Sequence, residues 1–129
     1  MKKFDNFVRA YNNLLSVNDY HEPYSLVEIT GLVGLFEICF EQSWKAIKEI
    51  MENNGYVEFK SGAPKHIIKC AFSAGLISDE EIWIDALVDR NNVAHSYNEA
   101  IALSIIRNTK NEYIPMFKAL IDEINKNWR

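Results

Sequence analysis

The sequence contains few of the residues that build metal sites and disulfide scaffolds. Its 129 residues include two cysteines and three histidines, and none of them follows the short spacings typical of a zinc site. Glycine-rich loops that hold phosphates and the Gly-x-Ser-x-Gly turn of serine hydrolases are also absent. We therefore predict no metal and no cofactor. Cys39 and Cys70 lie in apolar helical surroundings, which favours two buried thiols over a disulfide.

Long hydrophobic runs and a large positive charge are absent as well. No apolar stretch approaches the roughly 20 residues that a membrane-crossing helix needs, and no N-terminal signal segment is apparent. Fourteen Lys and Arg face eighteen Asp and Glu, so the formal charge is −4. This balance argues against a protein that coats nucleic acid non-specifically, because such a protein needs a large basic face. We expect a cytoplasmic protein with no membrane association; a local site for a phosphate or a short RNA remains open.

Helical periodicity, in contrast, is abundant. Apolar residues recur at intervals of three and four along five segments. The predicted helices cover residues 2–17, 25–53, 63–74, 79 to 95 or 97, and 99–128. Residues 57–60 alternate in polarity but have no partner strand, so we expect coil there. The pattern predicts one all-α domain over residues 1–129, an up-and-down antiparallel four-helix bundle with an additional short helix.

Several residues predict how these helices begin, pack and bend. Ser25 with Glu28, and the pair at residues 78–81, match the capping box in which a hydroxyl and a carboxylate satisfy free backbone amides. The segment Gly31–Gly34 places two glycines on one side of the second helix, which predicts a close approach by a neighbouring helix. Pro115 is predicted to kink or break the last helix, because it removes a backbone hydrogen bond.

The second helix carries a polar group and a tryptophan beside its broad apolar face. Glu37 and Glu41 lie one turn apart, where two carboxylates repel each other unless a cation or the amino groups of a base lie between them. Trp44 could close the core, form a dimer contact or stack on a base. These three residues and Lys45 are therefore candidate binding residues. The alternative is a solvated face on which Glu41 pairs with Lys45 or Lys48.

The sharpest chemical signal lies at the end of the fourth helix. The guanidinium of Arg90 can hold a phosphate through its fork of donors, the imidazole of His95 can transfer a proton near neutral pH, and the phenol of Tyr97 can donate a hydrogen bond or accept a covalent group. On a continuous helix Arg90 and His95 would be about 140° apart around the axis and about 7.5 Å apart along it, so they could border one groove. Together these groups suit a phosphodiester. The alternative is that Arg90 and His95 only face the carbonyls at the end of their helix.

These segments together resemble a known family. The order of the helices, residues 36–45, the turn at residues 75–77 and the run from Asp89 to Tyr97 are similar to the nucleotidyltransferase substrate-binding proteins of the HEPN superfamily. The resemblance spans nearly the whole chain. It implies a helical bundle that usually forms a homodimer, and a minimal nucleotidyltransferase as the partner protein.

The resemblance implies two functions. In the first, the chain is a substrate-binding or regulatory subunit that pairs with the nucleotidyltransferase and binds a nucleotide or phosphorylated ligand near the Arg90-x-x-x-x-His95-x-Tyr97 motif. In the second, the chain is a metal-independent ribonuclease toxin. Arg90 then orients the scissile phosphate of RNA, His95 is the general acid or base, Asn91 supports the pair, and the transferase silences the toxin by attaching AMP to Tyr97. The acidic chain favours the first function. A third possibility is an inert bundle in which Arg90 and His95 only cap a helix.

Overall fold

The structure, a computed structural model, describes residues 1–56 and 62–129, and the regular structure in these residues is entirely helical. The six α-helices are α1 (Lys2–Leu14), α2 (Leu26–Asn53), α3 (Pro64–Ser73), α4 (Glu80–Asn91), α5 (Glu99–Asn108) and α6 (Ile114–Asn127). Two 3₁₀ turns, η1 (Leu15–Asp19) and η2 (Asn92–His95), and one π turn, η3 (Thr109–Tyr113), connect them. The predicted all-α helical bundle is confirmed, while the coil predicted at residues 57–60 lies outside the described residues.

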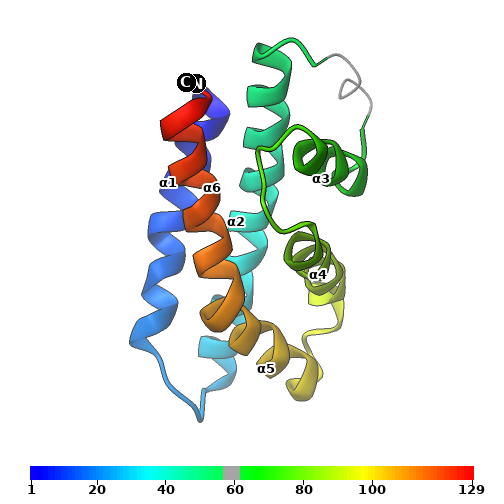
Figure 1. Cartoon of the computed structure of the whole chain (residues 1–129). Coiled ribbons are helices and arrows are strands. Elements are labelled where there is room, and N and C mark those ends of the chain that lie inside the picture. The colour runs from blue at the N-terminus through cyan, green and yellow to red at the C-terminus, as the bar shows by residue number, and fades with distance from the viewer. Residues whose placement is uncertain (57–61) are drawn as a thin grey trace.

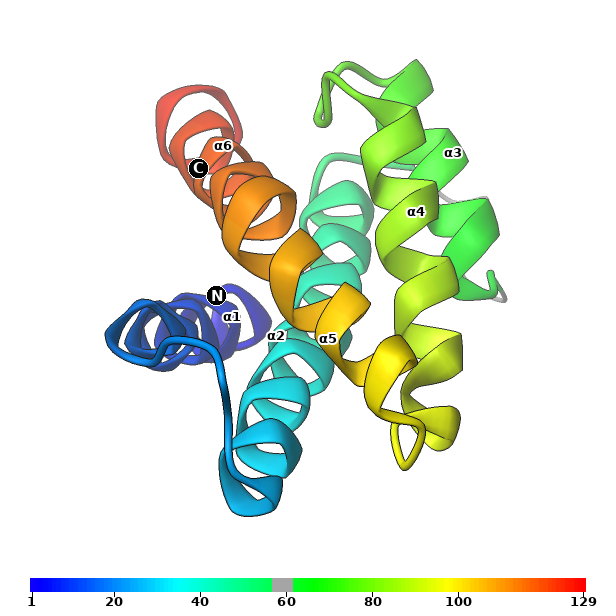
Figure 2. The same ribbon diagram turned by 90° about the horizontal axis from the view of Figure 1, so that it is seen from below.

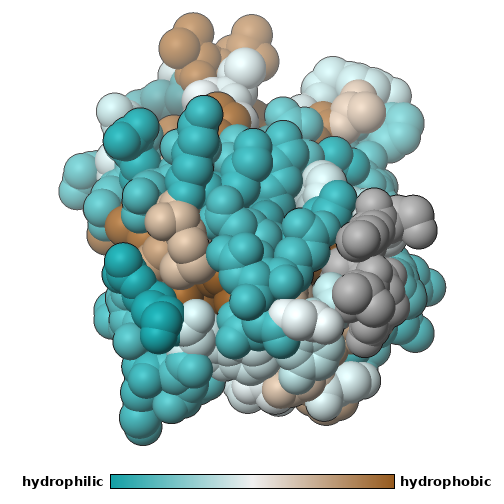
Figure 3. Space-filling model, turned by 90° about the horizontal axis from the view of Figure 1, so that it is seen from above, coloured by the Kyte–Doolittle hydropathy of each residue, from teal (hydrophilic) through white to brown (hydrophobic). Residues whose placement is uncertain are grey.

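Helix α2 is the central element of the bundle. Figure 1 shows α1 and α6 on one side of it and α3 and α4 on the other, with α5 at one end and both chain termini together at the opposite end. The view along the bundle in Figure 2 shows the same two sides separated by α2. The face at the end with the termini is mostly hydrophilic (Figure 3). No helix in the described ranges is long and apolar enough to cross a membrane.

Aromatic side chains connect the two sides through the core. The ring of Phe117 on α6 meets Phe7 of α1 edge-on at a centroid distance of 5.8 Å, and Trp83 of α4 edge-on at 5.7 Å. Phe36 of α2 stacks on Tyr113 at 5.2 Å. All five side chains are at most 2% exposed. Such pairs add about 0.5–1.5 kcal/mol each to the burial of their area, so they fix α4 and α6 relative to α2.

Neither cysteine forms a disulfide within the described residues, as predicted, but only Cys39 is the buried thiol that was expected. Cys39 is fully buried and Cys70 is half-buried. Burial raises the pKa of the Cys39 thiol well above its usual range, because an apolar surrounding disfavours the thiolate. Cys39 is therefore a core residue and an unreactive thiol.

The predicted caps are half correct. Ser25 and Glu28 form the capping box: the Glu28 N–H donates to Ser25 Oγ at 3.1 Å, and the Ser25 N–H donates to Glu28 Oε1 at 2.8 Å. The box predicted at residues 78–81 is wrong, because α4 begins one residue later. Asp79 is the cap there, and its carboxylate accepts the N–H of Ile82 at 3.2 Å. Asp and Ser are similarly good caps, so adjacent candidates could not be ranked from sequence.

The predicted break at Pro115 is confirmed, and its form is the π turn η3. Pro115 lies in the first turn of α6, where a missing N–H costs little. Hydrogen bonds in a π turn join residues five apart, which brings Asn108 and Tyr113 to the same side of the chain. The close approach predicted at Gly31 and Gly34 is wrong, since an added Cβ at either glycine meets no atom of the described chain within 4 Å.

Candidate functional site

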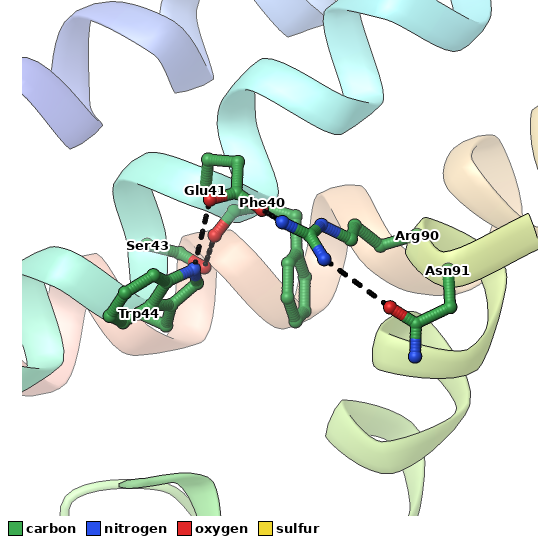
Figure 4. A network of polar contacts seen from close by, with 6 residues as sticks. All are labelled: Phe40, Glu41, Ser43, Trp44, Arg90 and Asn91. Atoms are coloured by element: carbon green, nitrogen blue, oxygen red, sulfur yellow. Dashed lines mark hydrogen bonds and ion pairs between the residues drawn. The ribbon is translucent and has the colours of Figure 1, made fainter. Parts of the chain in front are cut away.

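The structure joins the two groups of candidate residues through one ion pair. Arg90, in the last turn of α4, forms an ion pair with Glu41 of α2 (Figure 4). The side chains are 33% and 24% exposed, so the pair is shielded but still reachable from solvent. The alternative pairing of Glu41 with Lys45 or Lys48 is wrong, because the carboxylate points to α4. The fold thus brings Glu41 and Trp44 of the first group together with Arg90 and Asn91 of the second.

Trp44 forms a hydrogen bond with the other oxygen of the Glu41 carboxylate. Its indole Nε1–H donates to Glu41 Oε2 at 3.2 Å, while Oε1 faces the guanidinium. Figure 4 shows the indole and the guanidinium on opposite sides of the Glu41 carboxylate. The indole is half-buried against the core. A flat aromatic ring and a positive charge are therefore held at fixed positions by a single acidic side chain.

The guanidinium has one buried donor, Nε, that is without an acceptor among the described residues. Arg90 Nη1 donates to the Asn91 side-chain oxygen at 3.3 Å, and Nη2 faces Glu41. Among the described residues, no acceptor takes the hydrogen of the buried Arg90 Nε. A buried donor without an acceptor costs about 1–3 kcal/mol, so the site would gain from an additional acceptor.

The second half of the motif lies on an open turn. The chain leaves α4 through η2, and both His95 and Tyr97 are exposed, Tyr97 at 85%. Their rings meet edge-on with a centroid distance of 6.2 Å. The 3₁₀ turn replaces the continuous helix on which the expected spacing of Arg90 and His95 depended. Within residues 1–56 and 62–129, no hydrogen bond or ion pair joins Arg90 to His95 or Tyr97.

A family model described as "Nucleotidyltransferase substrate binding protein like" matches residues 2–126. The chain belongs to this family. The predicted family is therefore confirmed over nearly the entire chain.

Two solved structures share the fold of this nucleotidyltransferase substrate binding protein-like chain. The crystal structure of ttk003001694 from Thermus thermophilus is 26% identical, with a TM-score of 0.74, and the match covers 95% of this chain and 98% of that one. HI0074 from Haemophilus influenzae is 20% identical, with a TM-score of 0.78 and coverage of 95% and 99%. Its structure is described as revealing the fold of a substrate binding domain of a nucleotidyltransferase. No curated protein matches the chain.

In this family member, two further hydrogen bonds anchor Asp89, the residue before Arg90. Asp89 Oδ2 accepts the Tyr113 hydroxyl at 2.5 Å and the Asn108 side-chain N–H at 3.0 Å. Burial, together with this hydrogen bond, raises the pKa of Tyr113. Sequence reasoning missed this contact because the apolar pattern placed Tyr113 simply in the core. The available signal was Asn108 five residues before Tyr113, which is meaningful only if a π turn is foreseen.

The remaining candidates take no part in these contacts. Glu37 and Lys45 lie one turn before and one turn after Glu41 on α2, and both are half-buried. None of the hydrogen bonds and ion pairs within the described residues involves either side chain. The described chain also contains no group of three or more His, Cys, Asp or Glu side chains that could hold a metal ion.

Proposed function

We propose that this chain is the substrate-binding or regulatory subunit of a minimal nucleotidyltransferase and that it binds a nucleotide or another phosphorylated ligand beside Arg90. The observation that supports this proposal is the Glu41–Arg90 ion pair with Trp44 on its other side. One carboxylate there compensates the charge of a guanidinium that is still one-third exposed. A phosphate can pair with the guanidinium in place of that carboxylate if Glu41, which is 24% exposed, turns toward solvent.

The donors and the ring of this site match the two parts of a nucleotide. A phosphate offers several strong acceptors, and Arg binds them with paired hydrogen bonds. The unused Nε–H of Arg90 is the kind of donor that such a group satisfies. If Glu41 turns away, the Trp44 indole also loses its acceptor and becomes available to stack on a base. Glu37 and Lys45, one turn away on either side, are proposed to contact the ligand at its edges.

Ligand binding is tested by calorimetric titration of the purified chain with AMP and with inorganic phosphate. We expect AMP binding to be lost in Arg90→Ala. Arg107→Ala is the matched control, because Arg107 forms a separate exposed ion pair with Glu22 at 2.5 Å. Equal AMP affinity in all three proteins would refute the proposed site.

Pairing with the enzyme is tested separately. The chain is co-expressed with the minimal nucleotidyltransferase, and the complex is followed by affinity purification and size-exclusion chromatography. We expect a stable complex at micromolar concentration. A transferase that elutes entirely alone at that concentration would contradict the proposed partnership, whatever the titrations show.

A ribonuclease toxin is the second candidate function, and the open turn after α4 favours it. The 85% exposure of Tyr97 leaves its hydroxyl accessible to a transferase that attaches AMP. In this proposal Arg90 orients the phosphate, His95 is the general acid or base and Asn91 supports them. Expression of the wild-type chain alone should then stop growth, whereas Arg90→Ala and His95→Ala should not. Equal growth of all three strains would rule the toxin out.

We further propose a homodimer through the open side of α2. Val27 and Ile38 are 81% and 55% exposed, and Gly31 and Gly34 lie between them with open space in front. At 100° per residue these positions span an arc of roughly 60°, so they form one smooth apolar stripe that approaches Glu41. Light scattering should show a dimer that Ile38→Asp dissociates. Phe72→Asp, at another exposed apolar position on α3, should leave the dimer intact. A monomeric wild-type chain would contradict this proposal.

A further inference from the structure

A separate groove lies between α6 and the segment that leads into α4. Its volume is about 740 Å³, and Figure 2 shows α6 and the start of α4 facing each other across this region. Apolar residues from both walls line the floor of the groove. They include Ile82 and Trp83 from α4 and Met116 and Ala119 from α6. None of the residues 37–45 or 89–97 lines it. This α4–α6 groove is therefore separate from the proposed ligand site.

The rim of the α4–α6 groove is acidic. Four carboxylates line it, and Lys126 is the single basic residue among the lining residues of the described chain; the four are Asp79, Glu112, Asp122 and Glu123. Lys118 partly offsets this charge through its ion pair with Asp122 at 2.9 Å. The groove still carries a clear excess of negative charge, which attracts a cationic partner and repels an acidic one.

The long wall of the groove has the dimensions of a helix. Its lining residues extend along η3 and α6 from Asn111 to Lys126, a rise of roughly 22 Å at 1.5 Å per residue. Exposed Pro115 and Ala119 interrupt the polar residues along this wall. A helix of about four turns would lie alongside, with apolar side chains against Ala119 and polar ones at the rim.

We propose that the α4–α6 groove docks an amphipathic helix of the partner nucleotidyltransferase, whose apolar face is flanked by Lys or Arg. This inference rests on the proposed partnership and adds the contact surface and its chemistry. The acidic rim selects the cationic flanks, and the apolar floor accepts the side chains between them. A second copy of this chain fits less well, because the chain itself carries a net charge of −4.

The first test fills the floor of the groove. Ala119→Arg adds a long side chain at an exposed position without removing a buried one. Binding to the purified nucleotidyltransferase is measured by biolayer interferometry, with Ala100→Arg at an exposed position on α5 as the matched control. We expect Ala119→Arg to raise Kd by about tenfold or more, because it obstructs the centre of the contact. Ala100→Arg should bind as the wild-type chain does.

The second test reverses a rim charge. Glu112→Lys should slow association by about threefold or more at low salt, and the difference should shrink as added salt screens the rim. Glu52→Lys, at an exposed position at the end of α2, makes the same charge change outside the groove and should have little effect. Circular dichroism and AMP titration check that each variant remains folded, since the AMP site lies elsewhere.

The outcomes separate this inference from the proposed function. If the wild-type chain binds the transferase and Ala119→Arg binds equally well, the groove is not the contact, although the partnership stands. If Ala119→Arg changes only the self-association of the chain, the groove is a contact between copies and the inference is wrong. If the wild-type chain binds no transferase, both the partnership and the inference fail. Loss of transferase binding with unchanged AMP binding supports the inference.

Discussion

The two halves of the Arg90–Tyr97 motif have opposite surroundings. Arg90 is held from one side by Glu41, and Asp89 beside it is held from the other side by Tyr113 and Asn108. Beyond α4, His95 ends η2 and lies on an open turn with Tyr97. A group that orients a phosphate needs a fixed position, whereas a group that is modified or that transfers protons needs access. The motif therefore combines a rigid half with an accessible half.

The rigid half depends on one carboxylate most of all. Asp89→Ala removes the acceptor of both the Tyr113 hydroxyl and the Asn108 amide, and Tyr113 is 1% exposed. We expect a loss of about 2–4 kcal/mol in the free energy of unfolding, since two donors lose their partner. Urea denaturation measures it. The matched control is Asp85→Ala, one turn earlier at an exposed position, and we expect it to stay within about 0.5 kcal/mol of the wild type. Equal losses in both variants would mean that the anchor contributes nothing.

The ion pair should contribute less stability but control ligand affinity. Glu41→Ala leaves Arg90 without its partner, and we expect a loss of about 1–2 kcal/mol, below the value for a fully buried pair because Arg90 is one-third exposed. Glu41→Gln keeps the shape of the side chain and an acceptor for Trp44, so its main effect is to free the guanidinium. AMP should then bind more tightly to Glu41→Gln than to the wild-type chain. Weaker AMP binding would show that Glu41 is part of the ligand contact and does not compete with it.

The anchor also predicts how stability changes at alkaline pH. Burial and the hydrogen bond to Asp89 raise the pKa of Tyr113 above its ordinary value of 10.0. The neutral phenol is therefore favoured in the folded chain, and this contribution is complete below pH 10. As the pH rises above 10, the unfolded chain loses the proton more readily, so stability falls. Urea midpoints between pH 8 and 11 should fall more in the wild-type chain than in Tyr113→Phe. Parallel curves would mean that Tyr113 does not control the alkaline transition.

The local features of the fold were accessible from sequence, but the contacts of the rigid half were not. The periodic apolar residues predicted the helices, and the hydroxyl and carboxylate of Ser25 and Glu28 predicted a cap that the structure contains. Each of these signals involves residues within one or two turns. The Glu41–Arg90 pair joins two helices, so it depends on how α2 and α4 pack. Lys45 and Lys48 were nearer partners along the chain, and sequence alone offered no reason to prefer Arg90.

The π turn is a second feature that local sequence signals did not predict. Pro115 predicted a break in the last helix, and the break is present. The proline does not specify the kind of break, however, and it is a π turn that places Asn108 and Tyr113 together on Asp89. Likewise, Gly31 and Gly34 indicated a close approach, but within the described chain nothing approaches them. The two glycines lie on an open surface of α2 in the described chain.

The accessible half of the motif should tolerate change with the smallest effect on stability. Tyr97→Ala and His95→Ala remove exposed side chains whose rings mainly meet each other, so each should change the free energy of unfolding by less than about 0.5 kcal/mol. Nitration with tetranitromethane provides a direct comparison with the rigid half. Peptide mapping should find Tyr97 modified early and Tyr113 protected until the chain unfolds. If Tyr97 reacts as slowly as Tyr113, its hydroxyl is covered in solution and cannot receive AMP from a transferase. Rapid nitration of Tyr97 that becomes slow when the transferase is added would place the enzyme on the open half of the motif.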